Sequence, residues 1–466
     1  MVPPGSSLHF IGICGTAMAS VAAALKSLGY QVTGSDTGVY PPMSDFLRER
    51  QIDISSPFSE SNLAHHPDLI VVGNAISRGN PEVEYALEHR LNTVSLPDLV
   101  HQTVLRRTRN LVVTGTHGKT TTSSLLTWIL VHDGLDPNFL IGGIAENLGQ
   151  GARFTDSEFS VIEGDEYDSA FFDKRSKFIH YAPEVAIFNN LEFDHADIFD
   201  SLGQIQRSFQ HFARLTPRNG MLLVNGDDPN LETIRQFPHA PVTTFGFGPE
   251  CDARIEALDS DETGVRFSVA GQEYRSPLFG IFNMRNAAAA ICAARHIGVT
   301  PQSIQNALNA FRGIKRRMTV RGEAGGVTVI DDFAHHPTAI AETLRALRER
   351  FRDRRLIAVF EPRSNTTRRK RFQTELADAL SLADAAFVGQ VARIDQLPEE
   401  DRLDIQRLSA DTGKHGRPAE AVDCTDTLVG RLREFSEPGD VVAIMSNGGF
   451  DGIHEKLIKA LEANAD

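Results

Sequence analysis

LVVTGTHGKTTTSSLLTWILVHDG, residues 111–134, begins with a short apolar run, continues through a turn of small residues and ends in a longer run of helix formers. The apolar run 111–114 predicts a short buried strand. Apolar residues then recur at the spacing of one helix face, at Leu125, Leu126, Ile129 and Leu130. Gly134 follows at the position expected for a C-terminal glycine cap. The segment therefore predicts a strand, a turn and a helix.

This strand, turn and helix together are typical of a phosphate-binding loop. Backbone N–H groups of such a turn and the positive helix N-terminus face an anion, Lys119 adds a point charge, and the Thr120 hydroxyl can hold Mg²⁺. The strict Walker pattern has glycine where this chain has Val113, and a strand-to-helix turn without ligand is the alternative. Because Lys-Thr stands at the helix start, we predict a nucleotide-triphosphate site. Its candidate residues are Gly115, Thr116, His117, Gly118, Lys119, Thr120 and Thr121.

The composition is that of a globular protein with more than one domain. The 466 residues exceed one ordinary hydrophobic core, so two or three domains are expected. A hydrophobic content of 41% and a charged content of 23% are typical of globular chains. The net charge of −14 argues against general binding to nucleic acid or to acidic membranes, so anionic ligands require locally basic pockets.

The cysteines and the first residues predict a cytoplasmic protein. Cys14, Cys251, Cys292 and Cys424 are far apart and have no metal or redox spacing, which suits a reducing compartment. The first ten residues, MVPPGSSLHF, have neither a charged n-region nor a long apolar run. No apolar run elsewhere reaches membrane-spanning length.

Residues 1–108 are predicted to form a first α/β domain. Residues 8–36 predict a strand, a glycine turn with Gly12 and Gly15, a helix and a second strand that ends at Asp36. The turn resembles a dinucleotide fingerprint only loosely, because Cys14 replaces its second glycine. An NAD site, a UDP-sugar site and a plain turn all remain open. The charged run 106–110 is expected to be a linker.

Residues 109–314 are predicted to form a central domain around the phosphate-binding loop. Two further strands are expected to end at Glu163 and near Asn189, and His195 follows the second. In a parallel sheet these ends lie on the same edge as the phosphate loop, so Glu163 and His195 are candidate metal ligands. A solvated acidic loop and a surface histidine are the alternative. Residues 241–279 predict antiparallel hairpins, and an Ala-rich helix follows with Asn283 and Asn286 at its start, where helix capping is the alternative to a ligand-binding role.

Residues 315–466 are predicted to form a third domain, a second open α/β sheet. Strand, polar loop and helix recur three times in this part. Polar residues again follow the strands, and about half of them are expected to be merely solvated. These residues are Asp331, Asp332, His335, His336, Arg363, Asn365, Thr366 and Asn447.

The motifs together resemble those of the Mur ligases, the ATP-dependent amide-forming enzymes of peptidoglycan synthesis. The matching segments, in chain order, are GTHGKTTT, EGDE, NNLEFDH, FNMRN, and KRRM followed by DDFAHHP. Two branches of this family use UDP-N-acetylmuramate: one adds L-alanine in de novo synthesis, and the other adds L-alanyl-γ-D-glutamyl-meso-diaminopimelate in peptidoglycan recycling. The chain is similar to the second branch in GICGTAM, VYPPMS, GNAISRGNPEVE, DEYDSAFFDKRSKF, EPRSNT and MSNGGFDGIH.

The resemblance implies a three-domain fold: a Rossmann-like N-terminal domain, a central P-loop ATPase-like domain and a Rossmann-like C-terminal domain. It implies that ATP phosphorylates the muramate carboxylate and that the amine of the peptide attacks the acyl phosphate. Mg²⁺ is the implied cofactor and ATP the co-substrate. UDP-N-acetylmuramate and the murein tripeptide are the implied partners, with no nucleic acid and no membrane, and the implied assembly is a monomer or a weak homodimer.

The resemblance also implies roles for particular residues. Lys119 would contact the β- and γ-phosphates, and Thr120, Glu163 and His195 would hold Mg²⁺. Asn283 matches the adenine contact, and Arg317 and Asp332 match third-domain residues that reach the nucleotide. Lys119, Glu163, His195 and Arg317 would thus be catalytic. The UDP-muramate candidates are Gly12, Cys14, Gly15, Thr16, Asp36 and Asn74, and the peptide candidates are His335, Arg363, Asn365 and Thr366.

Two positions depart from the family pattern. Several Mur ligases carry a carbamoylated lysine about fourteen residues after the metal-binding histidine, where this chain has Phe209. No lysine lies between Lys177 and Lys315, so that modification is excluded at this place. The histidine that usually precedes the adenine-contacting asparagine is Phe282 here, so stacking replaces one nucleotide contact in this interpretation.

Three other functions are compatible with parts of the chain. The alanine-adding ligase would share all the chemistry and differ only in the third-domain pocket. An NAD-dependent dehydrogenase could use the first glycine turn, but it would leave the phosphate loop without a role. A non-catalytic nucleotide-dependent regulator would not need polar loops after every strand. ADP release that requires both UDP-muramate and a peptide would separate these possibilities.

Overall fold

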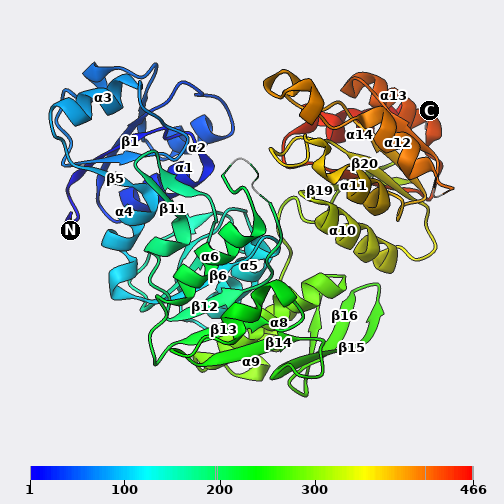
Figure 1. Ribbon diagram of the computed structural model, residues 1–466, viewed down its shortest axis with the longest axis horizontal. Helices are drawn as coiled ribbons and strands as arrows, with labels where there is room; N and C mark the ends of the chain where they lie inside the picture. The colour runs from blue at the N-terminus through cyan, green and yellow to red at the C-terminus, as the bar shows by residue number, and fades with distance from the viewer. Residues whose placement is uncertain (1, 195, 197, 415, 464–466) are drawn as a thin grey trace.

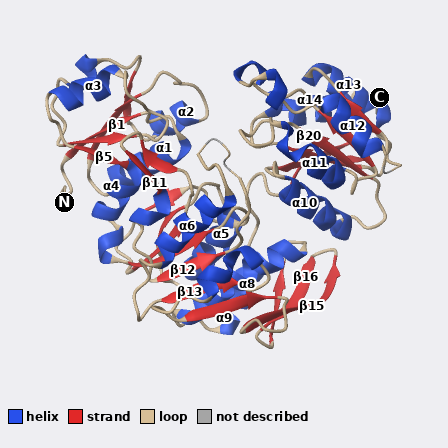
Figure 2. Ribbon diagram, in the orientation of Figure 1, coloured by secondary structure: helices blue, strands red, loops and turns tan. Residues whose placement is uncertain are grey.

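The computed structural model describes residues 2–194, 196, 198–414 and 416–463 of the chain. Three sheets, each with helices around it, follow one another along the chain (Figures 1 and 2). None of the helices in these ranges is long and apolar enough to cross a membrane. The expected α/β class with three successive sheets is confirmed.

The first sheet is parallel and has the strand order β3-β2-β1-β4-β5, which is the order typical of Rossmann-like folds. Its strands are β1 (Ser7–Ile11), β2 (Gln31–Ser35), β3 (Asp53–Ser55), β4 (Leu69–Val72) and β5 (Thr93–Ser95). The helices of this part are α1 (Thr16–Ser27), α2 (Met43–Glu49), α3 (Pro81–Glu88) and α4 (Leu96–Thr103).

The central sheet has the order β17-β16-β15-β14-β13-β12-β6-β9-β7-β8 and is parallel from β15 to β7. Its strands are β6 (Arg109–Thr114), β7 (Asn138–Leu140), β8 (Ala152–Arg153), β9 (Phe159–Glu163), β12 (Val185–Phe188), β13 (Met221–Asn225), β14 (Val242–Gly246), β15 (Ala253–Asp261), β16 (Gly264–Val269) and β17 (Gln272–Ser276). The expected hairpins are confirmed, because β15, β16 and β17 pair antiparallel. The small hairpin of β10 (Asp168–Ala170) and β11 (Asp173–Ser176) forms a separate sheet.

The helices of this part are α5 (Lys119–His132), α6 (Leu202–Ala213), α7 (Glu232–Arg235), α8 (Ile281–His296) and α9 (Pro301–Asn309). The Ala-rich helix α8 packs against α5, and its alanines 287–290, 293 and 294 are all buried. Small side chains let the two helix backbones approach closely, so α5, which carries Lys119 and Thr120 in its first turn, is held firmly in the core.

The third sheet has the order β18-β19-β23-β20-β21-β22, with only β18 antiparallel among the described strands. Its strands are β18 (Thr319–Ala324), β19 (Val327–Asp332), β20 (Leu356–Phe360), β21 (Ala385–Val388), β22 (Ala419–Ala421) and β23 (Val441–Met445). Its helices are α10 (Pro337–Arg350), α11 (Gln373–Leu380), α12 (Ile405–Gly413), α13 (Thr425–Phe435) and α14 (Ile453–Glu462).

The inner parallel strands of the second and third sheets are buried on both faces, which explains their unbroken apolar runs. In β12, Val185 and Ile187 belong to one hydrophobic cluster, while Ala186 and Phe188 belong to another on the opposite face. The strand β20 alternates in the same way between two clusters. Each fully buried large side chain contributes about 1.5–3 kcal/mol to folding, so these strands are rigid supports for the loops at their carboxyl ends.

The expectation of a charged linker at 106–110 is wrong. Residues Leu105–Arg107 form a short 3-10 helix, and Arg109 and Asn110 already belong to β6. The Arg109 guanidinium lies 2.6 Å from a carboxylate oxygen of Glu184. The side-chain amide of the buried Asn110 donates to three backbone carbonyl groups. These polar contacts allow charged and polar residues to lie inside the strand.

Candidate active site

The predicted phosphate-binding turn connects β6 to α5, and its glycines adopt backbone angles that favour glycine. Gly115 has a φ of +138° and Gly118 has a φ of +80°. A Cβ atom on Gly118 would lie only 2.2 Å from Oδ1 of Asn286, and one on Gly115 would lie 2.9 Å from Cβ of Asn189. The turn is therefore packed closely against α8 and the loop after β12. It lines a cavity of about 1090 Å³, to which Glu163, Arg317 and His335 also contribute.

We expect Gly118→Ala to abolish nucleotide binding while Gly134→Ala retains it. Gly134 caps the other end of α5 with a similar φ of +85°, but no atom lies within 4 Å of its added Cβ. Alanine in the left-handed region costs about 1–3 kcal/mol of stability at either site, so the two variants differ in the clash with Asn286 and in the place of Gly118 in the phosphate turn. Titration of ATP into both proteins, with thermal melting, measures the difference. Equal ATP affinities of Gly118→Ala and Gly134→Ala would contradict the prediction, because the phosphate turn would then bind ATP even when the alanine Cβ displaces its backbone.

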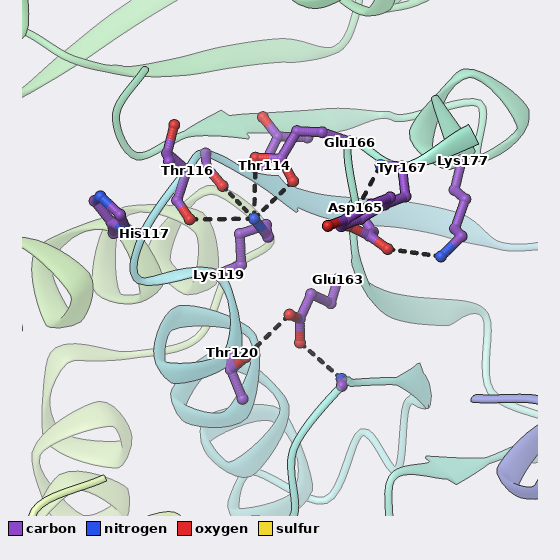
Figure 3. A network of polar contacts seen from close by, with 12 residues as sticks. Thr114, Thr116, His117, Lys119, Thr120, Glu163, Asp165, Glu166, Tyr167 and Lys177 are labelled. Atoms are coloured by element: carbon purple, nitrogen blue, oxygen red, sulfur yellow. Dashed lines mark hydrogen bonds and ion pairs between the residues drawn. The ribbon is translucent and has the colours of Figure 1, made fainter. Parts of the chain in front are cut away.

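Lys119 folds back over the turn, with its ammonium group among oxygen atoms (Figure 3). Its Nζ donates to the Gly115 carbonyl at 2.6 Å, and it lies 2.7 Å from a carboxylate oxygen of Glu166. Burial alone would lower the pKa of Lys119, but the carboxylates of Glu166, Asp165 and Glu163 outweigh it and raise the pKa. The lysine is thus a fixed positive charge at the helix N-terminus, where an incoming phosphate would exchange with Glu166.

Thr120 and Glu163 lie together beside this turn (Figure 3). The Thr120 hydroxyl donates to Oε1 of Glu163 at 2.9 Å, and the backbone N–H of Gly142 donates to Oε2 at 2.7 Å. Burial raises the pKa of Glu163, although Lys119 opposes this effect. A hydroxyl and a desolvated carboxylate are hard oxygen donors that suit Mg²⁺. The third expected metal ligand, His195, lies outside the described residues.

The loop after β12 contacts the third domain with three successive residues. Oε2 of Glu192 accepts from the Thr338 hydroxyl at 2.7 Å, and Oδ1 of Asp194 accepts from the Thr366 hydroxyl at 2.7 Å. Between them, the Arg371 guanidinium lies 3.7 Å from the ring centre of Phe193. Residues 192–194 are therefore held by Thr338 of α10 and by Thr366 and Arg371, which lie between β20 and α11.

The alternative role of Asn283 and Asn286 as helix caps is excluded, because Gly280 occupies the N-cap position and both asparagines lie inside α8. The Asn283 amide donates to the Phe279 carbonyl at 2.8 Å, and the Asn286 amide donates to Oδ1 of Asn283 at 3.2 Å. Oδ1 of Asn286 then accepts from the Thr122 hydroxyl. Both residues line the cavity next to Phe282, and Asn286 packs directly against Gly118 of the phosphate turn.

Third-domain residues at the end of β19 form another wall of the cavity. Arg317, Asp332 and His335 line it. Burial lowers the pKa of Arg317 and of His335, and it raises the pKa of Asp332. The carboxylate of Asp332 accepts from the backbone N–H groups of Met318 and Ala334, both at 2.7 Å. Asp332 thus holds the turn that presents Arg317.

The other expected peptide residues follow β20 and have protein partners. The Arg363 guanidinium lies 3.4 Å from Oε1 of Glu361 and packs so closely on Gly448 that a Cβ there would clash with it. Oδ1 of Asn365 accepts from Arg368 at 2.8 Å. Thr366 is buried and bonded to Asp194 across the domain boundary. Arg363 is partly accessible, with 37% of its side chain exposed.

The six first-domain candidates lie at the carboxyl edge of the first sheet. Gly12, Cys14, Gly15 and Thr16 follow β1, Asp36 follows β2, and Asn74 follows β4. The Asp36 carboxylate accepts from the backbone N–H of Cys14 at 2.9 Å and thereby fixes the glycine turn. Thr16 also lines the central cavity, so this edge faces the phosphate turn.

Phe209, at the position of the modified lysine of several Mur ligases, lies in a cluster of aromatic side chains. Phe209 is fully buried, and its ring stacks edge-to-face on Phe178 with centroids 5.4 Å apart. Phe188 and Phe212 complete the cluster. A carbamate in place of the Phe209 ring would have to lie among the other three aromatic rings, those of Phe178, Phe188 and Phe212.

Sequence reasoning missed several polar residues of the cavity region. Glu166 stands in the quoted EGDE motif, but no spacing indicated that it would pair with Lys119. Arg316 donates to the carbonyl groups of Ser446 and Gly448, both at 2.7 Å, and so fixes the last loop of the third domain. Glu192 and Asp194 were overlooked because their partners lie on another domain. Their position directly before His195 is the signal that could have indicated them.

Three family models match successive parts of the chain. The model described as Mur ligase family, catalytic domain, matches residues 7–108. The Mur ligase middle domain matches residues 113–294, and the Mur ligase, glutamate ligase domain matches residues 316–448. Together they cover most of the 466 residues.

Whole-length relatives agree with these matches. The UDP-N-acetylmuramate–L-alanyl-gamma-D-glutamyl-meso-2,6-diaminoheptandioate ligase of Escherichia coli (strain K12) is 44% identical over 98% of this chain and 99% of its own. The UDP-N-acetylmuramate–L-alanine ligase of Bordetella avium is 33% identical over 97% of this chain and 98% of its own. A crystal structure of a murein peptide ligase from Psychrobacter arcticus has a TM-score of 0.72 at 36% identity, covering 98% of this chain and 99% of that one. The chain belongs to the Mur ligase family.

Proposed function

We propose that the protein is an ATP-dependent amide ligase that joins L-alanyl-γ-D-glutamyl-meso-diaminopimelate to UDP-N-acetylmuramate, in the recycling of peptidoglycan. The observation that carries this proposal is one cavity lined by the phosphate turn, by Glu163, by the third-domain residues Arg317 and His335, and by Thr16 of the first domain. Such an arrangement brings ATP, a carboxylate and an amine to one place. The 44% identity to the Escherichia coli ligase supports the choice of substrates.

In the first step, a carboxylate oxygen of UDP-muramate attacks the γ-phosphorus of ATP, and ADP leaves. Two anions must approach each other, so screening of their charges is the main requirement. Lys119 supplies a fixed ammonium group, and the free N–H groups at the start of α5 would face the phosphates of bound ATP. Mg²⁺ held by Thr120, Glu163 and His195 would supply further positive charge when bound. The side chain of Arg317 approaches from the third domain.

In the second step, the N-terminal amine of the tripeptide attacks the acyl phosphate, and phosphate leaves as the amide bond forms. The peptide would occupy the third-domain wall, where His335 lines the cavity and Arg363 follows β20. Burial lowers the pKa of His335, so it is neutral near pH 7 and able to accept a hydrogen bond from an ammonium or amine. Binding of remote carboxylates to basic residues would position the amine.

The decisive experiment measures ADP release with each combination of substrates. We expect ADP release to require ATP, UDP-muramate and an acceptor, and to be far faster with the tripeptide than with L-alanine. Faster release with L-alanine than with the tripeptide would assign the chain to the alanine-adding branch, one member of which, from Bordetella avium, is 33% identical. Release without any acceptor would indicate a nucleotide-dependent regulator, and reduction of NAD without ATP would indicate a dehydrogenase.

Loss of the predicted metal ligand His195 should raise the Mg²⁺ requirement more than the ATP requirement. The reason is that His195 is assigned to the ion between the two anions, whereas the phosphate turn itself binds ATP. Removal of one ligand typically weakens such a site by about tenfold or more. Mg²⁺ titrations of ligation by the wild type and by His195→Ala measure the effect. The exposed His211 of α6 provides a matched control as His211→Ala, and superimposable titrations for all three proteins would remove His195 from the metal site.

The proposal includes an organisation and a setting for the enzyme. We place the domain boundaries near residues 108 and 314, with UDP-muramate, ATP and peptide bound by the first, second and third domains in turn. We propose a cytoplasmic monomer or weak homodimer that needs Mg²⁺. Size-exclusion chromatography with light scattering measures the assembly directly.

A further inference from the structure

Two histidines and a glutamate from separate segments converge between the central and third domains. His117 belongs to the phosphate turn, Glu192 to the loop after β12, and His336 to the N-cap of α10. One nitrogen of each imidazole and one oxygen of the carboxylate all lie within 4.8 Å of one another. The His117 imidazole points away from the Lys119 ammonium (Figure 3), so it is not directed at the predicted phosphate position.

The distances fit a shared ion better than hydrogen bonds. Nε2 of His117 lies 3.4 Å from Oε2 of Glu192, and Nδ1 of His336 lies 3.5 Å from the same oxygen. Hydrogen bonds between such atoms are about 2.7–3.2 Å long. Ligands about 2.0–2.1 Å from a tetrahedral Zn²⁺ ion are about 3.3–3.4 Å apart. These two separations, from Glu192 to each histidine, therefore match two edges of a tetrahedron around an ion, and the two imidazole nitrogens lie within 4.8 Å of each other.

The surroundings also suit metal ligands. Among the described residues, Nε2 of His117 is a buried atom without a hydrogen-bond partner. The Thr338 hydroxyl donates to Oε2 of Glu192, and the Phe372 ring packs against the His336 ring with centroids 4.9 Å apart, so both ligands are held in place. Glu192, with 31% of its side chain exposed, leaves access for a fourth ligand from solvent.

We propose that His117, Glu192 and His336 form a binding site for one zinc-type divalent ion, distinct from the predicted Mg²⁺ site at Thr120 and Glu163. Two imidazole nitrogens and one carboxylate oxygen with an open fourth position are typical of Zn²⁺, whereas Mg²⁺ prefers oxygen donors. His117 and Glu192 come from the central domain and His336 from the third. The bound ion therefore links the phosphate turn to the third domain.

The test uses the full chain without nucleotide and without Mg²⁺. Zn²⁺ is titrated by calorimetry, and Co²⁺ is used as a spectroscopic substitute, because tetrahedral Co²⁺ has intense visible bands. We expect one tight site in the wild type. His117→Asn, Glu192→Gln and His336→Asn should each weaken Zn²⁺ binding about tenfold or more and remove the visible bands. Asparagine retains the N-cap function at position 336, and glutamine can still accept from Thr338, so these variants keep the local fold.

Two matched variants distinguish this site from other metal binding. Glu163→Gln disrupts the predicted Mg²⁺ site, and His296→Asn removes an exposed histidine at the far end of α8. Both should bind Zn²⁺ within about twofold of the wild type. The proposal is overturned if the wild type binds no Zn²⁺ tightly, if the three ligand variants bind like the wild type, or if Glu163→Gln abolishes binding. Circular dichroism verifies the fold of every variant, and His117→Asn, in a turn outside the helices and strands, decides the outcome if His336→Asn does not fold.

Discussion

Lys119→Ala is expected to abolish ligation while it leaves UDP-muramate binding almost unchanged. The ammonium group of Lys119 lies over the phosphate turn, 2.6 Å from the Gly115 carbonyl and 2.7 Å from Glu166. Removal of a fixed charge that stabilises a developing anion costs about 10³-fold in rate, or about 4 kcal/mol. The first-domain candidates lie on a different sheet, so their ligand should not depend on this charge.

The measurement combines turnover of the three substrates with calorimetric titration of UDP-muramate. Lys177→Ala is a suitable control, because its ammonium group lies 2.6 Å from Asp165 in the same region but does not contact the phosphate turn in the described structure. We expect this control to retain activity within about threefold. If Lys119→Ala lost ligation and UDP-muramate binding equally while circular dichroism showed an intact fold, the assignment of ATP and UDP-muramate to separate domains would be wrong.

The second expected result concerns the acceptor: the tripeptide should be used far better than L-alanine. The reacting amine of a peptide has a pKa of about 7.7–8.0, so much of it is already neutral near physiological pH. The additional carboxylates of the tripeptide provide binding energy that can hold this amine near the acyl phosphate. The basic segment 361–369 of the third domain is the expected contact. The measurement is kcat/KM for both acceptors.

Arg363 is the residue with which we test this contact. Its guanidinium lies 3.4 Å from Glu361 and packs on Gly448, an arrangement that fixes the orientation of its planar group. Arg363→Lys keeps the charge but loses the bidentate geometry, so kcat/KM for the tripeptide should fall about tenfold, or about 1.4 kcal/mol. The kcat/KM for L-alanine should change little between the wild type and Arg363→Lys. An unchanged tripeptide value would remove Arg363 from the peptide site, and a preference of the wild type for L-alanine would indicate the other branch.

The sequence alone determined the features that depend on local pattern. The phosphate turn, its strand and its helix were predicted because their apolar spacing and glycines are contiguous in the chain. The cap at Gly134 is confirmed, with a φ of +85° and a backbone bond from its N–H to Val131. The end of β9 at Glu163 is confirmed for the same reason. The family motifs are likewise short contiguous segments, and membership in the Mur ligases is confirmed by all three family models.

Only the tertiary structure decided which polar side chains meet. Asn286 supports Gly118 because α8 crosses beneath the phosphate turn, a contact 168 positions apart along the chain that no periodicity encodes. Arg109 and Asn110 belong to a strand because Glu184 and backbone carbonyl groups from 181 and 182 satisfy them there. Thr366 bonds to Asp194, and His336 lies beside His117 and Glu192, because the third domain rests on the loop after β12. Hydrophobic spacing is a property of neighbouring residues, whereas these polar contacts depend on how separate sheets pack together.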